Sequence, residues 1–431
     1  MNKKEIVKDC IDSLLKAGAH NVQCVLQDWE RTELNVESNK MNLLRTTYNT
    51  SLHLTAIIDD KKGAISINKT DRDSIDEAIG QVIELAEASE ADSANDIAEK
   101  QLPKKFSDGP EEPQLDNMYS RLKEFLQYAE EKYPKTILEQ VIIDFVKVKS
   151  YFQNSNGVDF ISRRGLTSFS AMFTSKDKEK TSSFNHSGFS AKTIDRAIKD
   201  YGSIEILLKQ SGEQVNARSF SDKITGDVIF TPDCMGDFIS TIVGTFLSDY
   251  SLITGNSIYK DKLNELIADP RLTLHSKPVS EEIVDGYFVT SDGYEAKNST
   301  IIEKGILKTF LLSLYGSKKT GIPRSVNLGG AYVVEPGDIL FNDMVKSVKK
   351  GILLCRFSGG SPSENGDFSG VVKNSYYIED GEIKYPLIET MISGNLAEML
   401  NQIKNISKER IDFGSAIFPW VQCSNLTISG K

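Results

Sequence analysis

The chain contains 431 residues, of which 39% are hydrophobic and 26% are charged, and its formal net charge is -10 at pH 7. That length allows two or three domains with buried cores, whereas the acidic balance argues against direct binding to the phosphate backbone of a nucleic acid. No stretch reaches the ~20 apolar residues that span a bilayer, so we expect no membrane segment.

Five cysteines are scattered along the chain, mostly among apolar neighbours: Cys10, Cys24, Cys234, Cys355 and Cys423. An odd number of widely spaced cysteines is typical of reduced thiols and not of a disulfide framework. The first residues favour an amphipathic helix from Lys3 to Ala17, ended by Gly18, and lack the continuous apolar block of a signal peptide. We therefore predict a cytoplasmic protein.

Alternating apolar residues predict four strands after this helix. They are Val22–Gln27, Thr32–Ser38, Ser51–Ile58 and Ala64–Asn68. In the third strand the alternation directs His53 away from the apolar face, and a histidine without an acidic or thiol partner is seldom a metal ligand. A second helix follows, for which Ser74 and Glu77 predict a capping box at the N-terminus.

The region from Ser89 to Gln114 is polar, with three prolines and many acids, and we interpret it as a surface loop. A helix from Leu115 to Tyr133, strands between Ile137 and Phe184, and a helix region from Ala191 to Lys209 follow. Helices packed on a meandering antiparallel sheet make an α+β arrangement. We therefore predict an N-terminal α+β domain over residues 1–220.

The second half of the chain is predicted to be mostly β. A strand at Asp227–Phe230 leads into a helix that begins at Pro232. Further strands are predicted at Tyr287–Thr290, Thr300–Glu303, Ile306–Leu312, Ala331–Glu335, Gly351–Phe357, Gly370–Glu379 and Glu382–Tyr385. Short strands separated by turn residues are typical of a barrel-like or sandwich sheet. Residues 221–431 are therefore predicted to form a β-rich C-terminal domain, and the fold class is α+β.

The helix after Pro232, about Asp233 to Tyr250, has a strong apolar stripe. A zinc-peptidase helix places two histidines one turn apart, with a glutamate beside the first as general base. The four histidines are His20, His53, His186 and His275. None has a neighbouring glutamate or a second histidine within a turn, so the sequence predicts no catalytic zinc site in this chain. It also lacks a phosphate-binding loop, a dinucleotide fingerprint, paired zinc cysteines and a Gly-x-Ser-x-Gly elbow.

The segment between Phe357 and Leu400 crowds four glycines among serines and acids: Gly359, Gly360, Gly366 and Gly370. Glycines at this density let another backbone come close, so an extended peptide could bind there by strand addition. They are equally suited to tight turns and bulges between strands. The residue types alone favour neither interpretation.

Four strings in the second half share a pattern with one known family. They are Ser358-Gly359-Gly360, Gly366-Asp367-Phe368-Ser369-Gly370, Ile378-Glu379-Asp380-Gly381-Glu382-Ile383, and Glu389-Thr390-Met391-Ile392-Ser393-Gly394-Asn395 with Met399-Leu400. They resemble the C-terminal signature of the TldD/PmbA family, and most closely its PmbA branch, also called TldE. The segments Glu303–Lys308, Glu335–Asp338 and Asn154–Gly157 resemble further landmarks of the family, so the resemblance covers nearly the whole chain.

The resemblance implies a cytosolic two-domain α+β protein that works in dimers. TldD-like members carry a His-Glu-x-x-x-His helix and a downstream cysteine that bind zinc, and TldD/TldE heterodimers are associated with proteolysis of unfolded or extended peptides. Here the corresponding helix has Asp237, Ser240 and Thr241 where ligands and base would stand, and Cys423 is the only late thiol, expected to be structural. PmbA-like members show the same departures, so the resemblance implies no cofactor in this chain and zinc only in a TldD-like partner.

We therefore expect a PmbA/TldE-like, non-catalytic subunit that pairs with a TldD-like subunit or with itself and helps to grip an extended peptide. By resemblance, its substrate-binding residues are Ser358, Gly359, Gly360, Gly366, Asp367, Phe368, Ser369, Gly370, Glu389 and Asn395. Two alternatives stay open. One is a stand-alone metal-dependent hydrolase whose unconventional site involves Asp237, Asp367, Glu389 or His275, although such ligands suit magnesium or calcium better than zinc. The other is a non-enzymatic interaction protein, a modulator of DNA gyrase.

Overall fold

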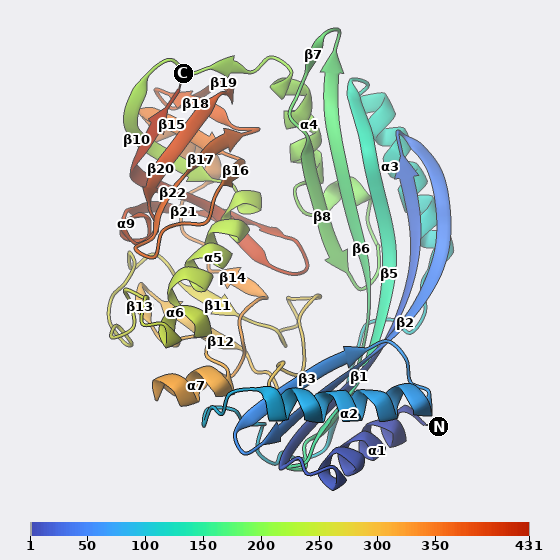
Figure 1. Cartoon of the computed structure of the whole chain (residues 1–431). Helices are drawn as coiled ribbons and strands as arrows, with labels where there is room; N and C mark the ends of the chain where they lie inside the picture. The colour runs from blue at the N-terminus through green and yellow to red at the C-terminus, as the bar shows by residue number, and fades with distance from the viewer. Residues whose placement is uncertain (1, 431) are drawn as a thin grey trace.

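Two β-sheets organise the chain in the computed structural model, which describes residues 2–430 (Figure 1). The first sheet has the strand order β3-β2-β1-β5-β6-β4, and β7 and β8 also pair with β6. Its strands are β1 (Asn21–Glu37), β2 (Lys40–Ile58), β3 (Lys61–Ile67), β4 (Lys104–Asp108), β5 (Thr136–Asn154), β6 (Asp159–Asp177), β7 (Lys180–Thr181) and β8 (Asn185–Ala191). Except for β4, which runs parallel to β6, neighbouring strands are antiparallel.

Helices cover one face of the first sheet. They are α1 (Lys3–Lys16), α2 (Arg72–Ala88), α3 (Leu115–Lys132), the 3-10 helix η1 (Ile198–Asp200) and α4 (Ile204–Gln214). Successive side chains of a strand point to opposite faces, so Cys24 and Leu26 of β1 are fully buried under α1 and α2. Val25 and Trp29 point to the opposite face, which looks toward the second half of the chain.

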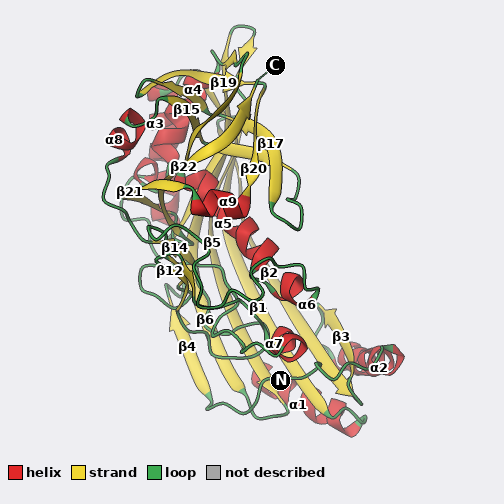
Figure 2. Cartoon of the chain, turned by 90° about the vertical axis from the view of Figure 1, so that its left-hand side faces the viewer, coloured by secondary structure: helices red, strands yellow, loops and turns green. Residues whose placement is uncertain are grey.

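The second sheet is larger and strongly curled (Figures 1 and 2). Its strands are β9 (Arg218–Ser219), β10 (Lys223–Phe230), β11 (Leu274–Ser276), β12 (Ser299–Glu303), β13 (Ile306–Leu307), β14 (Tyr332–Val334), β15 (Lys350–Leu354), β16 (Arg356–Gly359), β17 (Asp367–Lys373), β18 (Tyr376–Glu379), β19 (Glu382–Ile388), β20 (Thr390–Asn395), β21 (Ile403–Asp412) and β22 (Ile417–Ser429). The central strand is β22, which pairs with β10, β14, β20 and β21.

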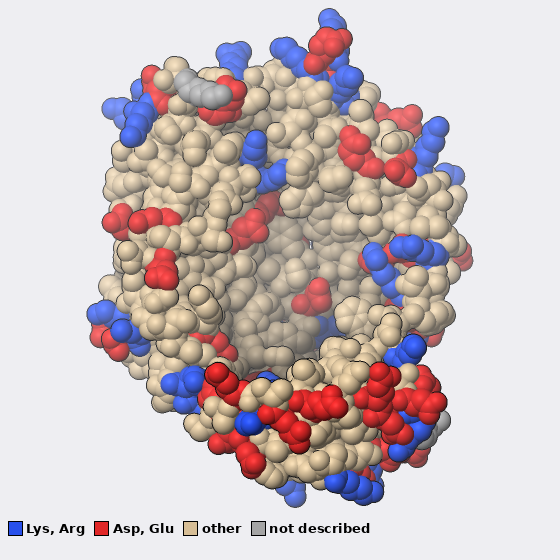
Figure 3. All heavy atoms as spheres, in the orientation of Figure 1, with Lys and Arg blue, Asp and Glu red and all other residues tan. Residues whose placement is uncertain are grey.

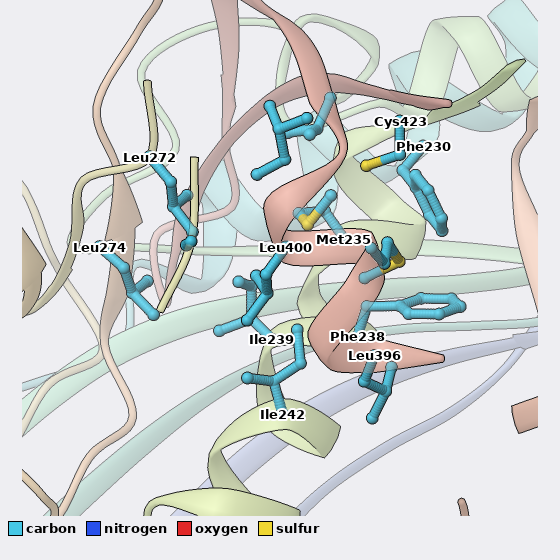
Figure 4. Packing of buried hydrophobic residues seen from close by; sticks show 14 of the residues in the cluster. Phe230, Met235, Phe238, Ile239, Ile242, Leu272, Leu274, Leu396, Leu400 and Cys423 are labelled. Atoms are coloured by element: carbon cyan, nitrogen blue, oxygen red, sulfur yellow. The ribbon is translucent and has the colours of Figure 1, made fainter. Parts of the chain in front are cut away.

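Five helices accompany this sheet. They are α5 (Pro232–Phe246), α6 (Asp249–Ile253), α7 (Leu314–Thr320), α8 (Phe341–Lys346) and α9 (Leu396–Asn401). The apolar stripe of α5 packs into the largest core, with Met235, Phe238 and Ile239 against Leu396 and Leu400 (Figure 4). The predicted α+β class, with helices on an antiparallel sheet and a β-rich second half, is confirmed. Throughout residues 2–430, no helix is both long and apolar enough to cross a membrane.

Several predicted boundaries were wrong for local reasons. The second helix begins at Arg72, because Asp71 is its N-cap and accepts a hydrogen bond from the Ser74 amide, so Ser74 already lies in the first turn. Residues from 191 to 197 are not helical, and Gly202, with φ of +53°, separates η1 from α4. That backbone conformation cannot continue a right-handed helix.

Two further differences depend on contacts between distant segments. The expected loop from Ser89 to Gln114 contains β4, an edge strand held by parallel pairing with β6, and its polar sequence gives no alternation to detect. Tyr287–Thr290 forms a single bridge, Val289 with Glu295, in place of a strand. Phe288 there stacks on Phe106 with ring centroids 5.2 Å apart, so its apolar residues pack against the first half of the chain.

Candidate functional site

The glycine-rich segment forms a hairpin of β16 and β17, extended by β20. Gly359 lies opposite Gly370, and Asp367 lies opposite Asn395. The register thus brings together nine of the ten residues predicted by resemblance: Ser358, Gly359, Gly360, Gly366, Asp367, Phe368, Ser369, Gly370 and Asn395. Glu389 lies apart, before the far end of β20, with φ of +51° and a carboxylate 3.4 Å from the Ser219 hydroxyl.

Two of these glycines are explained by packing inside the hairpin. A methyl group at Gly370 would lie 2.3 Å from the Phe357 ring, and one at Gly359 would lie 2.5 Å from it. Gly360, in contrast, has open space around its Cα. Asn395 caps α9, because its side-chain oxygen accepts from the Ala397 amide at 2.9 Å. Gly359, Gly370 and Asn395 therefore have structural reasons, Gly360 has none in its packing, and their role in substrate binding stays a prediction.

A cavity of 580 Å³ lies between this hairpin and α5. Gly359, Gly360 and Phe368 line it from the hairpin side, and Asp237 and Thr241 line it from α5. Ser358, Asp367 and Ser369 are exposed on the hairpin, outside this lining. The structure thus places three of the predicted binding residues at a cavity wall.

A second cavity of 470 Å³ continues along α5, because Asp237 also lines it. Its far wall is β8, and Arg356 contributes from β16. Arg356 Nη1 donates to the Phe184 carbonyl at 2.7 Å, which ties β16 to the segment before β8. We call the two cavities together the α5 trough, and Figure 3 shows the hollow between the two halves of the molecule.

Among the titratable side chains at the α5 trough, His186, Asp233 and Arg356 have pKa values shifted by burial. Burial lowers the pKa of His186, and the nearby Arg356 lowers it further, whereas Asp237 acts in the opposite direction. Burial also raises the pKa of Asp233 to about 6, although the Ser203 hydroxyl donates a hydrogen bond to its carboxylate. Burial lowers the pKa of Arg356, and Asp237 counters that effect.

The sequence did not single out His186 or Arg356. Neither belongs to a motif, and they are separated by most of the second half of the chain. The one available signal was the run of small polar residues in β8, such as Ser187 and Ser190, where a buried strand would carry larger apolar residues.

The side chains of the α5 trough do not suit a zinc ion, which takes three or four nitrogen, sulfur or oxygen ligands. Across residues 2–430, no group of three or more His, Cys, Asp or Glu is arranged to hold a metal. At the corresponding positions of α5, the Ser240 and Thr241 hydroxyls donate to the Gly236 and Asp237 carbonyls at 2.9 and 2.7 Å. Cys423 is buried in the core (Figure 4), where burial raises its pKa.

The residues of the alternative metal site are also dispersed. His275 lies on β11, with its ring nitrogens 2.9 Å from the Thr300 hydroxyl and 3.0 Å from the Glu335 carboxylate. Asp367 accepts from the Asn395 amide at 2.9 Å. Asp237 faces the trough and Glu389 lies at the far end of β20. The structure does not bring these four residues together.

Comparison with known families agrees with this architecture. Residues 223–430 match the PmbA/TldA metallopeptidase C-terminal domain, and residues 22–86 match domain 1 of the same metallopeptidases. The chain thus belongs to a metallopeptidase-related class of protein. The chain is a member of the PmbA/TldD family, as the sequence strings indicated.

Curated relatives match over part of their length. A zinc metalloprotease TldD homologue from Saccharolobus solfataricus is 32% identical over 201 residues, 43% of this chain and 44% of the relative. The metalloprotease PmbA of Escherichia coli O157:H7 is 26% identical over 249 residues, 53% of each chain. The matched segments thus span about half the length of these relatives.

Solved structures match over nearly the whole chain. TldE from Thermococcus kodakarensis has a TM-score of 0.84 at 19% identity and covers 99% of this chain and 100% of its own. A protein from Bacteroides thetaiotaomicron, described as a candidate modulator of DNA gyrase, has a TM-score of 0.85 at 22% identity and covers 99% of both chains. At these identities the likeness establishes the fold alone.

Proposed function

We propose that this chain is the PmbA/TldE-like, zinc-free subunit of a TldD/TldE-type metallopeptidase that acts on extended or unfolded peptides. The observation that carries the proposal is the polar face of α5. It lines the cavities but presents Asp237, Ser240 and Thr241, and the hydroxyls of Ser240 and Thr241 donate to carbonyls of the helix itself. A TldD-like partner subunit would supply the zinc, and a homodimer is the alternative assembly.

The strands around the α5 trough support a role in holding an extended peptide. β16 pairs with β17 along one edge, and β8 pairs with β6 along one edge. In the described part of the chain, no strand pairs with the other edge of either. The Ser190 amide of β8 already donates to the Phe413 carbonyl at 2.9 Å, so β16 has the freer edge. An unpaired strand edge beside a cavity suits strand addition, in which backbone hydrogen bonds hold the peptide largely independently of its sequence. Asp237, His186 and Arg356 are then the polar groups nearest to the bound backbone.

Two further parts of the proposal concern organisation and location. We assign residues 1–220 and 221–431 to two domains, which is supported by the division of the sheets between Ala191 and Arg218. We place the protein in the cytoplasm, because its five cysteines are all free and buried.

The test uses the purified chain alone and mixed with a TldD-like partner. Zinc content and cleavage of an unstructured peptide are measured in both samples, with Asp237→Ala and Glu389→Ala as variants of the alternative metal site. We expect no stoichiometric zinc in the chain alone and cleavage only in the mixture. Stoichiometric zinc with robust cleavage by the chain alone would refute the proposal. Recovery of gyrase, but of no TldD-like protein, in a pull-down would favour the gyrase-modulator alternative.

A further inference from the structure

A third cavity, of 750 Å³, lies on the inner face of the first sheet, which the helices leave uncovered. The segment from Asp285 to Ser291 closes it from the side of the second half. Its walls combine aromatic and apolar side chains, with Trp29 from β1, Phe152 from β5 and Phe288 from the closing segment, and polar ones that include glutamines and serines. We call it the inner-face cavity.

Among the described residues one cation lines this cavity, Arg164 of β6, which is partly buried and has one donor group without a hydrogen-bond partner. Its Nε is buried and has no hydrogen-bond partner anywhere in residues 2–430. The guanidinium lies 4.8 Å from the centre of the Phe288 ring. Burial lowers the pKa of Arg164, and the fields of Asp285 and Asp108 only partly compensate. Asp108 is itself paired with Lys192 at 2.6 Å.

The neighbouring Arg163 has a structural role, and its guanidinium donors all have hydrogen-bond or ion-pair partners. Its side chain points to the other face and donates to the Ser107 hydroxyl at 2.7 Å and to the Gly109 and Pro110 carbonyls at 2.9 and 2.8 Å. It also forms a salt bridge with Glu111 at 2.8 Å. The same residue type, one position along β6, therefore has every partner that Arg164 lacks.

A partly buried guanidinium with an unsatisfied donor group, beside an aromatic and aliphatic surface, fits one kind of ligand. The planar fork of arginine binds carboxylates through paired hydrogen bonds, and such bonds strengthen when water is excluded. The apolar walls would bind an uncharged side chain beside that carboxylate. Asp285, whose pKa burial raises, also lines the cavity, and its carboxyl is engaged by Ser190.

The inner-face cavity lies next to the α5 trough. Ser168 lines the inner-face cavity and Ser190 lines the trough, and their hydroxyl oxygens are 3.4 Å apart. An extended peptide held along the trough would therefore reach Arg164 with one end. We propose that Arg164 binds the carboxylate at the C-terminus of the extended peptide, with the last side chain on the aromatic wall of the inner-face cavity. This inference rests on the proposed peptide-binding function.

The test measures binding of N-terminally labelled, unstructured peptides to the full chain by fluorescence anisotropy. One peptide ends in leucine with a free carboxylate, a second is its C-terminal amide, and a third is the amide with an internal glutamate. We expect the free acid to bind about 10- to 100-fold more tightly than either amide, the range of a charge-assisted hydrogen-bonded pair. Because this comparison uses the unaltered protein, it does not depend on whether a variant folds.

Variants then test whether Arg164 causes the difference in affinity between the free acid and the amides. Arg164→Gln should abolish the preference for the free acid, Arg164→Lys should retain part of it, and the matched control Arg163→Gln should retain it in full. Equal binding of the acid and the plain amide would overturn the inference while leaving the proposed function intact. Equally tight binding of the glutamate-containing amide would overturn the assignment to the C-terminus. Failure of all three peptides to bind would overturn the function and the inference together.

Discussion

Asp233 is a partly buried carboxyl group in the first turn of α5, where a substitution tests the electrostatics of the trough. It lines the cavity between α5 and β8. Burial raises its pKa from 3.8 to about 6, and the hydrogen bond from Ser203 only partly offsets this. No salt bridge to Asp233 occurs among residues 2–430. Replacing Asp233 with asparagine keeps the size and a hydrogen-bond acceptor but removes the charge.

The sign of the effect follows from proton linkage. Between pH 3.8 and about 6 the folded protein retains a proton that the unfolded chain has lost, so the free energy of unfolding falls as pH rises. Each pH unit in this window costs about 1.4 kcal/mol, which gives a total on the order of 3 kcal/mol by neutral pH. Below pH 3.8 the carboxyl group of Asp233 is protonated in both the folded and the unfolded state, so its burial no longer lowers the free energy of unfolding. The Asp233→Asn variant should therefore be more stable than the wild type at neutral pH, and the difference should vanish on acidification.

The assay is chemical unfolding of both proteins at several pH values between about 4 and 8. The matched control is Asp73→Asn, which changes an exposed aspartate in the first turn of α2. We expect the stability difference between Asp233→Asn and wild type to grow with pH across the window, and that of the control to stay nearly constant. A difference for Asp233→Asn that is independent of pH, or that decreases as pH rises, would refute the reasoning.

Three further substitutions test the packing and charge arguments by denaturant unfolding. Gly370→Ala should destabilise the protein by about 1–3 kcal/mol, because the new methyl group would lie 2.3 Å from an aromatic ring. The control Gly360→Ala, whose methyl group meets nothing within 4 Å, should have little effect. Equal losses of stability in the two variants would contradict the explanation. Asp292→Ala should lower the free energy of unfolding by about 3–5 kcal/mol, because it leaves the Arg324 guanidinium, 15% exposed, without its paired carboxylate. A decrease below about 1 kcal/mol would count against a buried ion pair. Arg164→Met should leave stability unchanged or increase it, because it removes an unsatisfied buried charge, whereas a structural role would make the variant less stable.

The parts of the fold that sequence could predict are those set by local periodicity. The stripe of α5 and the alternation around Leu52 and Leu54 were both read correctly, because burial on one face leaves a direct trace in the sequence. The prediction divided β1 into two strands because Asp28 to Arg31 interrupts the alternation. Those residues lie where both faces of the sheet are partly open to solvent, so no burial enforces a pattern there.

The trough could not be predicted from sequence because its walls come from segments far apart in the chain. Nothing local distinguishes Arg164 from Arg163; only the strand register, which sends adjacent residues to opposite faces, gives them different surroundings. His186 likewise meets the field of Arg356 only after β8 and β16 approach each other. The family strings include the β16–β17 hairpin, which forms one wall of the trough, whereas the wall formed by β8 became evident only from the fold.

The position of β22 at the centre of the second sheet also governs when that half of the molecule can form. β10 begins at Lys223, but its partners β15 and β22 begin only at Lys350 and Ile417, and β14 and β20 also pair with β22. Such distant pairing slows folding and leaves strand edges exposed meanwhile. During synthesis the first sheet can close once β8 has left the ribosome, while the second must wait for β22. The half that carries α5 is therefore the part of the nascent chain most exposed to misassembly.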